Sequence, residues 1–436
     1  MHADGSRKVV LIGAGSAVFT RGLLADLIVE GEDCELALVD IDPDALEVAC
    51  RLAEKMVAAR GAPIALSKHL DRREALPGAD FVVTTIAVGG RRAWEQDVLI
   101  PRRYGIYQPV GDTIMPGGIS RALRQIPAML DIARDVSEFA PDAHFFNYAN
   151  PMAAICRAVH KATGQDVVGL CHGVKSGERH LADMLGVEAE RCRFTAVGMN
   201  HLCFFTEFAV DGEDAFPRLR NVLEGGESEK GEYLRRKLFL ECGLYSVLND
   251  RHLSEFFPQF YRDGSHPHGR LGVDLFSFER CIEGGERGYE AMADQAFGRT
   301  PLDESVFERQ LGEHEQLVSI FRCLEGREEG RFSVIVPNTG QVTNLPSEFA
   351  LECPAQVSGT GIKPEAIGEV PRFLRALVEK ALLTVELAVD AAVERSRQKF
   401  LEAIVADGAA ASMEDARALA GDLWEANAQW LEDGPR

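Results

Sequence analysis

The sequence lacks the features of proteins that act on nucleic acids or within membranes. It carries 47 Lys and Arg against 68 Asp and Glu, a formal net charge of −21 over 436 residues. No basic run interrupts this acidity, and an acidic surface repels phosphate backbones and anionic lipids. No uncharged stretch is long enough for a membrane span, and no apolar export segment is present. We therefore expect a cytoplasmic protein without nucleic-acid or membrane partners.

Paired cysteines are also missing. Ten cysteines are present, but none forms a C-x-x-C pair. That spacing is typical of zinc knuckles and thioredoxin-type redox sites, so neither is predicted. Most of these cysteines are expected to be reduced and buried.

The first part of the chain alternates between short apolar runs and helical periodicity. Strands are predicted at 8–12, 36–40, 79–88, 144–148 and 167–171, and helices at 43–60 and 119–139. Strands that alternate with helices are typical of βαβ units and a parallel sheet. We therefore expect residues 1–172 to form a Rossmann-type, doubly wound α/β domain.

The remainder, residues 173–436, has a different pattern. Antiparallel strands are predicted at 193–210, 332–336, 341–345 and 349–352, and a long helix at 372–406. Residues 337–340 would join the two middle strands. This pattern predicts a mixed α+β second domain.

A glycine turn follows the first predicted strand. Gly13, Gly15 and Ser16 open a helix, where free backbone N–H groups and the helix dipole favour a pyrophosphate. The third glycine of the dinucleotide fingerprint is replaced by Val18, so the turn could also be only a tight connection. Asp40 ends the next strand, where a carboxylate would accept bonds from both ribose hydroxyls and repel a 2′-phosphate. We therefore expect NAD rather than NADP, although Asp40 could instead cap the following helix.

A cysteine and a histidine follow a predicted strand. Cys171 and His172 lie at the carboxyl end of the last strand of the first domain, the edge where open α/β sheets bind ligands. A thiolate and an imidazole suit a divalent metal, and His201 could supply another ligand. From the residues alone, a buried cysteine and two hydrogen-bonded histidines remain the alternative.

Five motifs occur together in the order and spacing of one enzyme family. They are Gly13-Ala-Gly-Ser, Val39-Asp-Ile-Asp42, Asn147-Tyr-Ala-Asn-Pro-Met152, Cys171-His-Gly-Val174 and Gly198-Met-Asn-His201. Through them the sequence resembles glycoside hydrolase family 4, the NAD- and manganese-dependent glycosidases. The resemblance implies a lactate/malate dehydrogenase-like first domain and a second domain for substrate, metal and oligomerisation. It also implies a homodimer or homotetramer.

The resemblance implies a mechanism without the usual pair of carboxylates. NAD oxidises C3 of the sugar, a base removes the C2 proton, the glycosidic oxygen is eliminated, water adds and the hydride returns. Cys171 and His201 would be the Mn²⁺ ligands, and His172 would contact sugar hydroxyls or metal-bound water. Asn150 would bind the C2 and C3 hydroxyls, and Asp250 would be the C2 base.

Smaller features bear on the substrate. His172 stands where phosphosugar members carry Asn or Asp, which favours an unphosphorylated sugar. Segments 108–113 and 250–256 look most like the α-galacturonidase members, and α-glucosides, α-glucuronides and α-galactosides are the alternatives. A uronide carboxylate would need a cation, for which Arg91, Arg92 and Arg251 are candidates. Arg91 or Arg92 could equally face solvent, and Asp250 could pair with Arg251 or cap a helix.

Two other functions compete with this interpretation. The first domain also resembles 2-hydroxy acid dehydrogenases, but their catalytic histidine turn and Arg-rich mobile loop are not found. A cofactor-binding regulator would keep the glycine turn, but would have no use for Asn150, Cys171, His201 and Asp250 together.

Overall fold

The first half of the chain forms a parallel sheet in the computed structural model, which describes residues 7–226, 229–308 and 316–432. Its six strands lie in the order β3-β2-β1-β4-β5-β6. They are β1 (Arg7–Ile12), β2 (Cys34–Val39), β3 (Ile64–His69), β4 (Phe81–Thr84), β5 (His144–Asn147) and β6 (Val168–Gly169). The apolar residues of β1, β2 and β4 are almost all buried. The predicted Rossmann-type α/β fold is confirmed.

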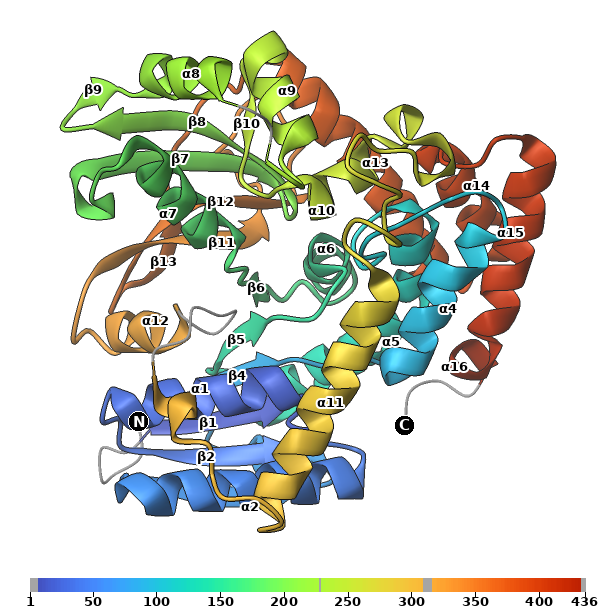
Figure 1. Ribbon diagram of the computed structural model, residues 1–436. Coiled ribbons are helices and arrows are strands. Elements are labelled where there is room, and N and C mark those ends of the chain that lie inside the picture. Colours follow the sequence, from blue (N-terminus) through green and yellow to red (C-terminus); the bar gives the residue numbers. More distant parts are fainter. Residues whose placement is uncertain (1–6, 227–228, 309–315, 433–436) are drawn as a thin grey trace.

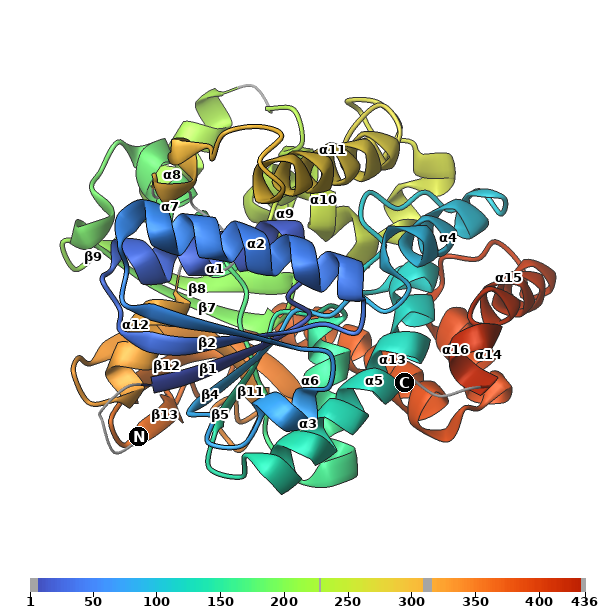
Figure 2. The same ribbon diagram turned by 90° about the horizontal axis from the view of Figure 1, so that it is seen from below.

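Helices connect these strands and cover both faces of the sheet. They are α1 (Ala17–Val29), α2 (Pro43–Arg60), α3 (Arg72–Ala75), α4 (Gly90–Arg102), α5 (Met115–Phe139), α6 (Met152–Thr163) and α7 (Gly173–Leu185). Figure 2 shows α1 and α2 on one face and α3 and α5 on the other. Right-handed crossovers between parallel strands produce this arrangement.

Antiparallel strands extend the same sheet beyond β6. They are β7 (Cys192–Met199), β8 (Leu202–Val210), β9 (Glu213–Asp214), β10 (Tyr245–Ser246), β11 (Gly330–Pro337), β12 (Ala350–Ser358) and β13 (Gly361–Pro364). The order continues β6-β11-β12-β7-β8-β10, and Ile335 of β11 pairs with Gly169 of β6. The two predicted regions therefore share one continuous sheet.

The remaining helices surround this extended sheet (Figure 1). They are α8 (Phe216–Gly225), α9 (Tyr233–Cys242), α10 (Asp250–Leu253), α11 (Phe278–Ala296), α12 (Leu317–Leu324), α13 (Arg372–Glu394), α14 (Arg397–Asp407), α15 (Met413–Ala426) and α16 (Ala428–Glu432). α11 packs against α2, and α13 packs against α5 and α6 of the first half. Among the described residues, no helix combines the length and apolar character needed to cross a bilayer.

The parallel arrangement decides where the predicted site residues meet. Parallel strands end at a common edge of the sheet. The carboxyl ends of β1, β2, β5 and β6 therefore bring the Gly13–Ser16 turn, Asp40, Asn150 and Cys171–His172 to one edge.

Two local predictions were wrong, and one strand was missed. Residues 341–345 form a loop rather than a strand, because Asn338 donates its amide to the carbonyls of Val342, Leu345 and Pro346. The predicted helix 372–406 is broken at Arg395, which adopts a left-handed φ of 52° before Ser396 caps α14. The polar edge strand β3 was not predicted.

A carboxyl group is enclosed where the antiparallel strands meet. Glu352 of β12 pairs with Gly198 of β7 and is 2% exposed. The amide of Asn200 and the hydroxyl of Ser333 donate to it, both at 3.5 Å. Burial raises the pKa of Glu352 from 4.5 to about 7, against which these two bonds act only weakly.

We expect this group to make stability fall as pH rises. Between pH 4.5 and about 7 the native Glu352 keeps a proton that the unfolded chain releases, which lowers the free energy of unfolding by about 3 kcal/mol in total. Glu352→Gln should remove this loss, measured by urea unfolding at pH 5 and pH 8. Glu402→Gln, at an exposed position of α14, is the matched control. An equal pH dependence in wild type and Glu352→Gln would contradict the expectation.

Candidate active site

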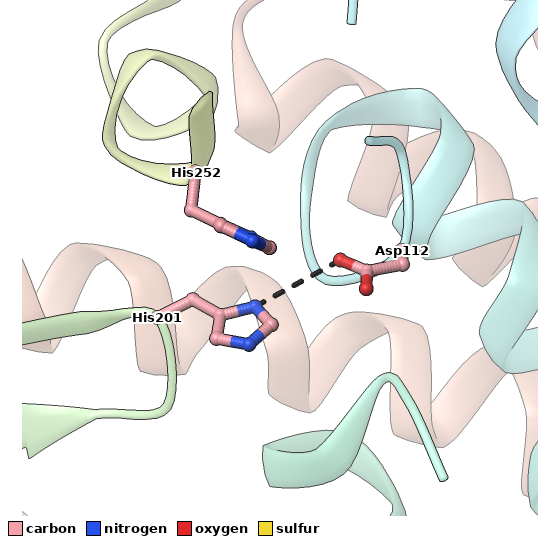
Figure 3. A group of neighbouring side chains, drawn as sticks. All are labelled: Asp112, His201 and His252. Atoms are coloured by element: carbon pink, nitrogen blue, oxygen red, sulfur yellow. Dashed lines mark ion pairs between the residues drawn. The ribbon is translucent and has the colours of Figure 1, made fainter. Parts of the chain in front are cut away.

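Three segments bring a carboxylate and two imidazoles together. Asp112 comes from the loop between α4 and α5, His201 from the turn between β7 and β8, and His252 from α10 (Figure 3). One ligand atom from each lies within 4.8 Å of the other two. Nδ1 of His201 lies 3.8 Å from Oδ1 of Asp112, and the two imidazole rings are 4.2 Å apart. This donor set has the composition of a divalent-metal site.

The turn that carries His201 is tightly constrained. His201 has a left-handed φ of 68°, which is uncommon for a residue with a side chain. A Cβ at Gly198 would collide with the carbonyl of Leu202, so the hairpin requires glycine there. Nδ1 of His201 lies 2.6 Å from Oγ1 of Thr113. The backbone conformation of His201 and the hydrogen bond to Thr113 together fix the orientation of the imidazole.

The hydrogen bonds around Thr113 fix the tautomer of His201. The Thr113 hydroxyl lies 2.7 Å from Oδ1 of Asp112, and an ionised carboxylate can only accept. The hydroxyl therefore donates to Asp112 and accepts from Nδ1–H of His201. The lone pair of that imidazole is then on Nε2, where it is available to a metal.

The electrostatics of the cluster suit a metal. Burial lowers the pKa of His201, and burial followed by repulsion from His201 lowers the pKa of His252 well below its usual value. Burial acts to raise the pKa of Asp112, but His201, His252 and Arg121 outweigh it, so the net shift is downward. At neutral pH the imidazoles are uncharged and the carboxylate is ionised. These are the protonation states that bind metal.

Asn150 contacts the same loop. Its amide donates to Oδ2 of Asp112 at 3.1 Å, and its Oδ1 accepts the N–H of Met152. Its carbonyl accepts from Arg121 and Gln125 on α5. Asn150 therefore lies beside the cluster in a fixed orientation, and its role in binding the sugar stays a prediction.

Cys171 and His172 directly precede α7. Cys171 is buried and does not belong to the group of Asp112, His201 and His252. The N–H of Gly173 donates to its Sγ at 3.4 Å. Nδ1 of His172 is buried and has no hydrogen-bond partner among the described residues. Such an atom requires a ligand or water.

The glycine turn has the geometry of a dinucleotide site. Gly13 has a φ of 94°, and a Cβ there would lie 2.9 Å from the backbone of Thr85. The N–H of Gly15 donates to Oδ2 of Asp40 at 2.8 Å, and a Cβ on Gly15 would lie 2.9 Å from that oxygen. Ser16 makes no side-chain capping bond to α1. Its hydroxyl therefore does not occupy the N–H groups of the first turn, which are the groups that bind anions at a helix N-terminus.

Asp250 has the helix-capping role that was the alternative to its predicted role as the C2 base. Its oxygens accept the N–H groups of Leu234 and Arg235 in the first turn of α9, and Nε2 of His266 lies 3.0 Å away. The carboxyl group is fully buried. It caps a helix, and the base role stays a prediction.

The predicted arginines separate into two groups. Arg251 lies close enough to lower the pKa of both His201 and His252. Arg91 instead stacks over Tyr289 of α11, and Arg92 is 78% exposed and pairs with Glu95 and Glu286. Arg91 and Arg92 are therefore engaged with α4 and α11 rather than with the cluster.

Three residues of the site escaped the sequence analysis. Asp112 and His252 lie in segments 108–113 and 250–256, which were used only to judge the substrate. Arg121 is anchored by its Nε to the carbonyl of Asn150 at 3.0 Å and packs over Trp94. No hydrogen bond joins its terminal nitrogens to the described residues. The available signal was the recurrence of carboxylate and histidine in these motifs, but spacing does not reveal which loops meet.

Comparison with known proteins identifies the family. The model described as Family 4 glycosyl hydrolase matches residues 8–187, and the one for its C-terminal domain matches 196–409. An alpha-galactosidase of Bacillus subtilis (strain 168) is 32% identical over 437 residues, with 98% of this chain and 99% of that one covered. An alpha-galacturonidase of the same strain is 30% identical over 425 residues, with 92% of each covered.

A solved structure agrees. The 6-phospho-alpha-glucosidase from gut microorganisms, in complex with NAD and glucose-6-phosphate, has a TM-score of 0.85 and 26% identity, with 98% of this chain and 99% of that one covered. The two family matches together span most of the chain. The chain is a glycosidase that belongs to glycosyl hydrolase family 4.

Proposed function

We propose that the chain is an NAD- and divalent-metal-dependent glycosidase that cleaves unphosphorylated α-glycosides, with α-galacturonides as the first choice. The cluster of Asp112, His201 and His252 beside Asn150 is the observation that carries this proposal. The alpha-galacturonidase relative is consistent with this substrate, and the alpha-galactosidase relative is consistent with an α-galactoside as the alternative. Membership of a glycosidase family sets aside the dehydrogenase and the non-catalytic regulator.

The residues fit a divalent metal such as Mn²⁺. The metal would be held by Nε2 of His201 and by Cys171, as the resemblance predicts. Asp112 and His252 belong to the same cluster, with Asp112 on the Nδ1 side of His201. Thr113 and Asp112 hold the opposite nitrogen of His201, and such a partner fixes the ring of a ligating histidine.

The residues also fit NAD. Its pyrophosphate would lie against the Gly13–Ser16 turn and the N-terminus of α1. Asp40 is half-buried next to that turn and already accepts from Gly15 and Asp42, and its remaining lone pairs would accept from the ribose. This carboxylate disfavours a 2′-phosphate.

The proposed division of labour follows the hydrogen bonds. Bound NAD would supply reversible hydride transfer at C3, and the metal would stabilise negative charge on the C2 and C3 oxygens. Asn150, held by Asp112, would orient those hydroxyls. His172 has a free Nδ1 to receive a hydroxyl or a metal-bound water. Asp250 remains the proposed base, although its present donors would have to be displaced first.

The first prediction from this proposed function concerns cofactor dependence. With p-nitrophenyl α-galacturonide, nitrophenol release should require NAD, Mn²⁺ and a thiol reductant together, without net formation of NADH. His201→Ala should lower activity at least about 100-fold, because it removes a ligand. Cys171→Ser and His252→Gln show which side chain completes the coordination. Release without NAD or metal, or NADH formed from 2-hydroxy acids alone, would refute the proposal.

A uronide carboxylate would need a cation near the cluster, and two arginines qualify. Arg251 lowers the pKa of both imidazoles, and the only hydrogen bond from its guanidinium to the described residues goes to Sγ of Cys281 at 3.5 Å. Arg121 is held beside Asn150 with its terminal nitrogens unused by the described residues. We propose these two as the carboxylate-binding candidates, ahead of Arg91 and Arg92.

The second prediction concerns that carboxylate. A charged hydrogen bond contributes about 1.5–3 kcal/mol, so Arg251→Met or Arg121→Met should lower kcat/KM for α-galacturonide about 10- to 150-fold relative to α-galactoside. Parallel assays on the two p-nitrophenyl substrates measure this ratio. Arg92→Met is the matched control and should leave it unchanged, since its guanidinium is exposed. Higher activity on α-galactoside or α-glucoside in the wild type would favour a neutral substrate.

A further inference from the structure

A carboxyl group lies directly behind the loop that carries Asp112. Glu255 follows α10 in a short helical turn (Ser254–Phe256) and is 2% exposed. Its Oε1 accepts the N–H of Val110 at 2.7 Å and the N–H of Gly111 at 2.9 Å. No ion pair joins it to a cation in the described part of the chain. A single oxygen thus accepts hydrogen bonds from the N–H groups of the two residues that precede Asp112.

The loop depends on such side-chain contacts, because it belongs to no helix or strand. Gly111 has a φ of 64°, and a Cβ there would lie 2.7 Å from Cγ2 of Val98. Nε2 of Gln108 donates to the carbonyl of Ile114 at 3.3 Å, and Nε1 of Trp94 donates to the carbonyl of Val110 at 2.7 Å. Few bonds therefore decide where the loop places Asp112 and Thr113.

Glu255 joins this loop to another part of the cluster. It lies three residues after His252, and residues at this spacing share one face of a helical turn. The same short segment therefore supplies His252 to the cluster and a bond to the loop of Asp112. Thr113 in turn bonds His201. These two connections tie together all three segments that build the cluster.

We propose that Glu255 is a positioning residue for the metal site: by holding the Val110–Gly111 peptides it fixes Asp112 and Thr113 against His201 and His252. The inference rests on the proposed metal site. The decisive property is the length of the side chain, which must bring an acceptor oxygen from the turn after α10 to the loop. Glutamine has the same reach, whereas aspartate is shorter by one methylene group. Partners behind a ligand typically change metal affinity 10- to 100-fold.

The test compares Glu255→Gln with Glu255→Asp in the metal-free, full-length protein. Titration with Mn²⁺, followed by electron paramagnetic resonance of the free ion, gives the Kd. Glu255→Gln should stay within about threefold of the wild type, and Glu255→Asp should bind about 10-fold more weakly or worse. NAD affinity, measured in parallel, should not change, since Gly13–Ser16 and Asp40 lie in other segments.

A second readout follows the loop without metal. Trp94 bonds Val110, so the Trp94 emission of Glu255→Asp should shift even in the apo protein, with Trp94→Phe identifying its share. Equal Mn²⁺ affinity in Glu255→Asp and wild type would overturn the inference. So would a loss in Glu255→Gln with none in Glu255→Asp, because charge rather than reach would then matter. Failure of the wild type to bind Mn²⁺ would instead refute the proposed metal site.

Discussion

The burial of one carboxylate beside two imidazoles is the constraint on which the rest of the site depends. Asp112 and His201 are almost completely enclosed, so each polar atom needs a partner or a ligand. Thr113 meets that need by accepting from His201 and donating to Asp112. Asn150 meets it on the other carboxylate oxygen. With Nδ1 of His201 donating to Thr113, the lone pair of this imidazole lies on Nε2.

One continuous sheet brings His201 of the cluster next to the other predicted site residues. The parallel strands deliver Asn150, Cys171 and His172 to their common edge, while the antiparallel hairpin of β7 and β8 presents His201. Neither half could build the cluster alone. The helices α11 and α13 reinforce the connection, because they belong to the second half of the sequence yet pack against α2 and α5 of the parallel half.

The net charge of −21 bears on how the protein would bind the proposed anionic ligands. A uronide and NAD are both anionic, so the overall field of the protein opposes the proposed ligands. Their binding must therefore depend on local groups. Arg121 and Arg251 provide positive charge close to Asp112 and His252. The N-terminus of α1 provides partial positive charge at the glycine turn.

The sequence by itself determined the α/β class, the glycine turn, most parallel strands and the family, because these depend on local periodicity and ordered motifs. It also indicated His201 as a candidate metal ligand. Only the tertiary structure decided that Asp112 and His252 join His201, that Asp250 caps α9 and that Arg92 faces solvent. The cluster depends on how loops more than 80 residues apart meet, as Thr113 and His201 do, and the other two outcomes depend on which partner a side chain finds in the folded chain. Spacing along the chain carries no information about such contacts, which packing and the satisfaction of buried polar groups decide.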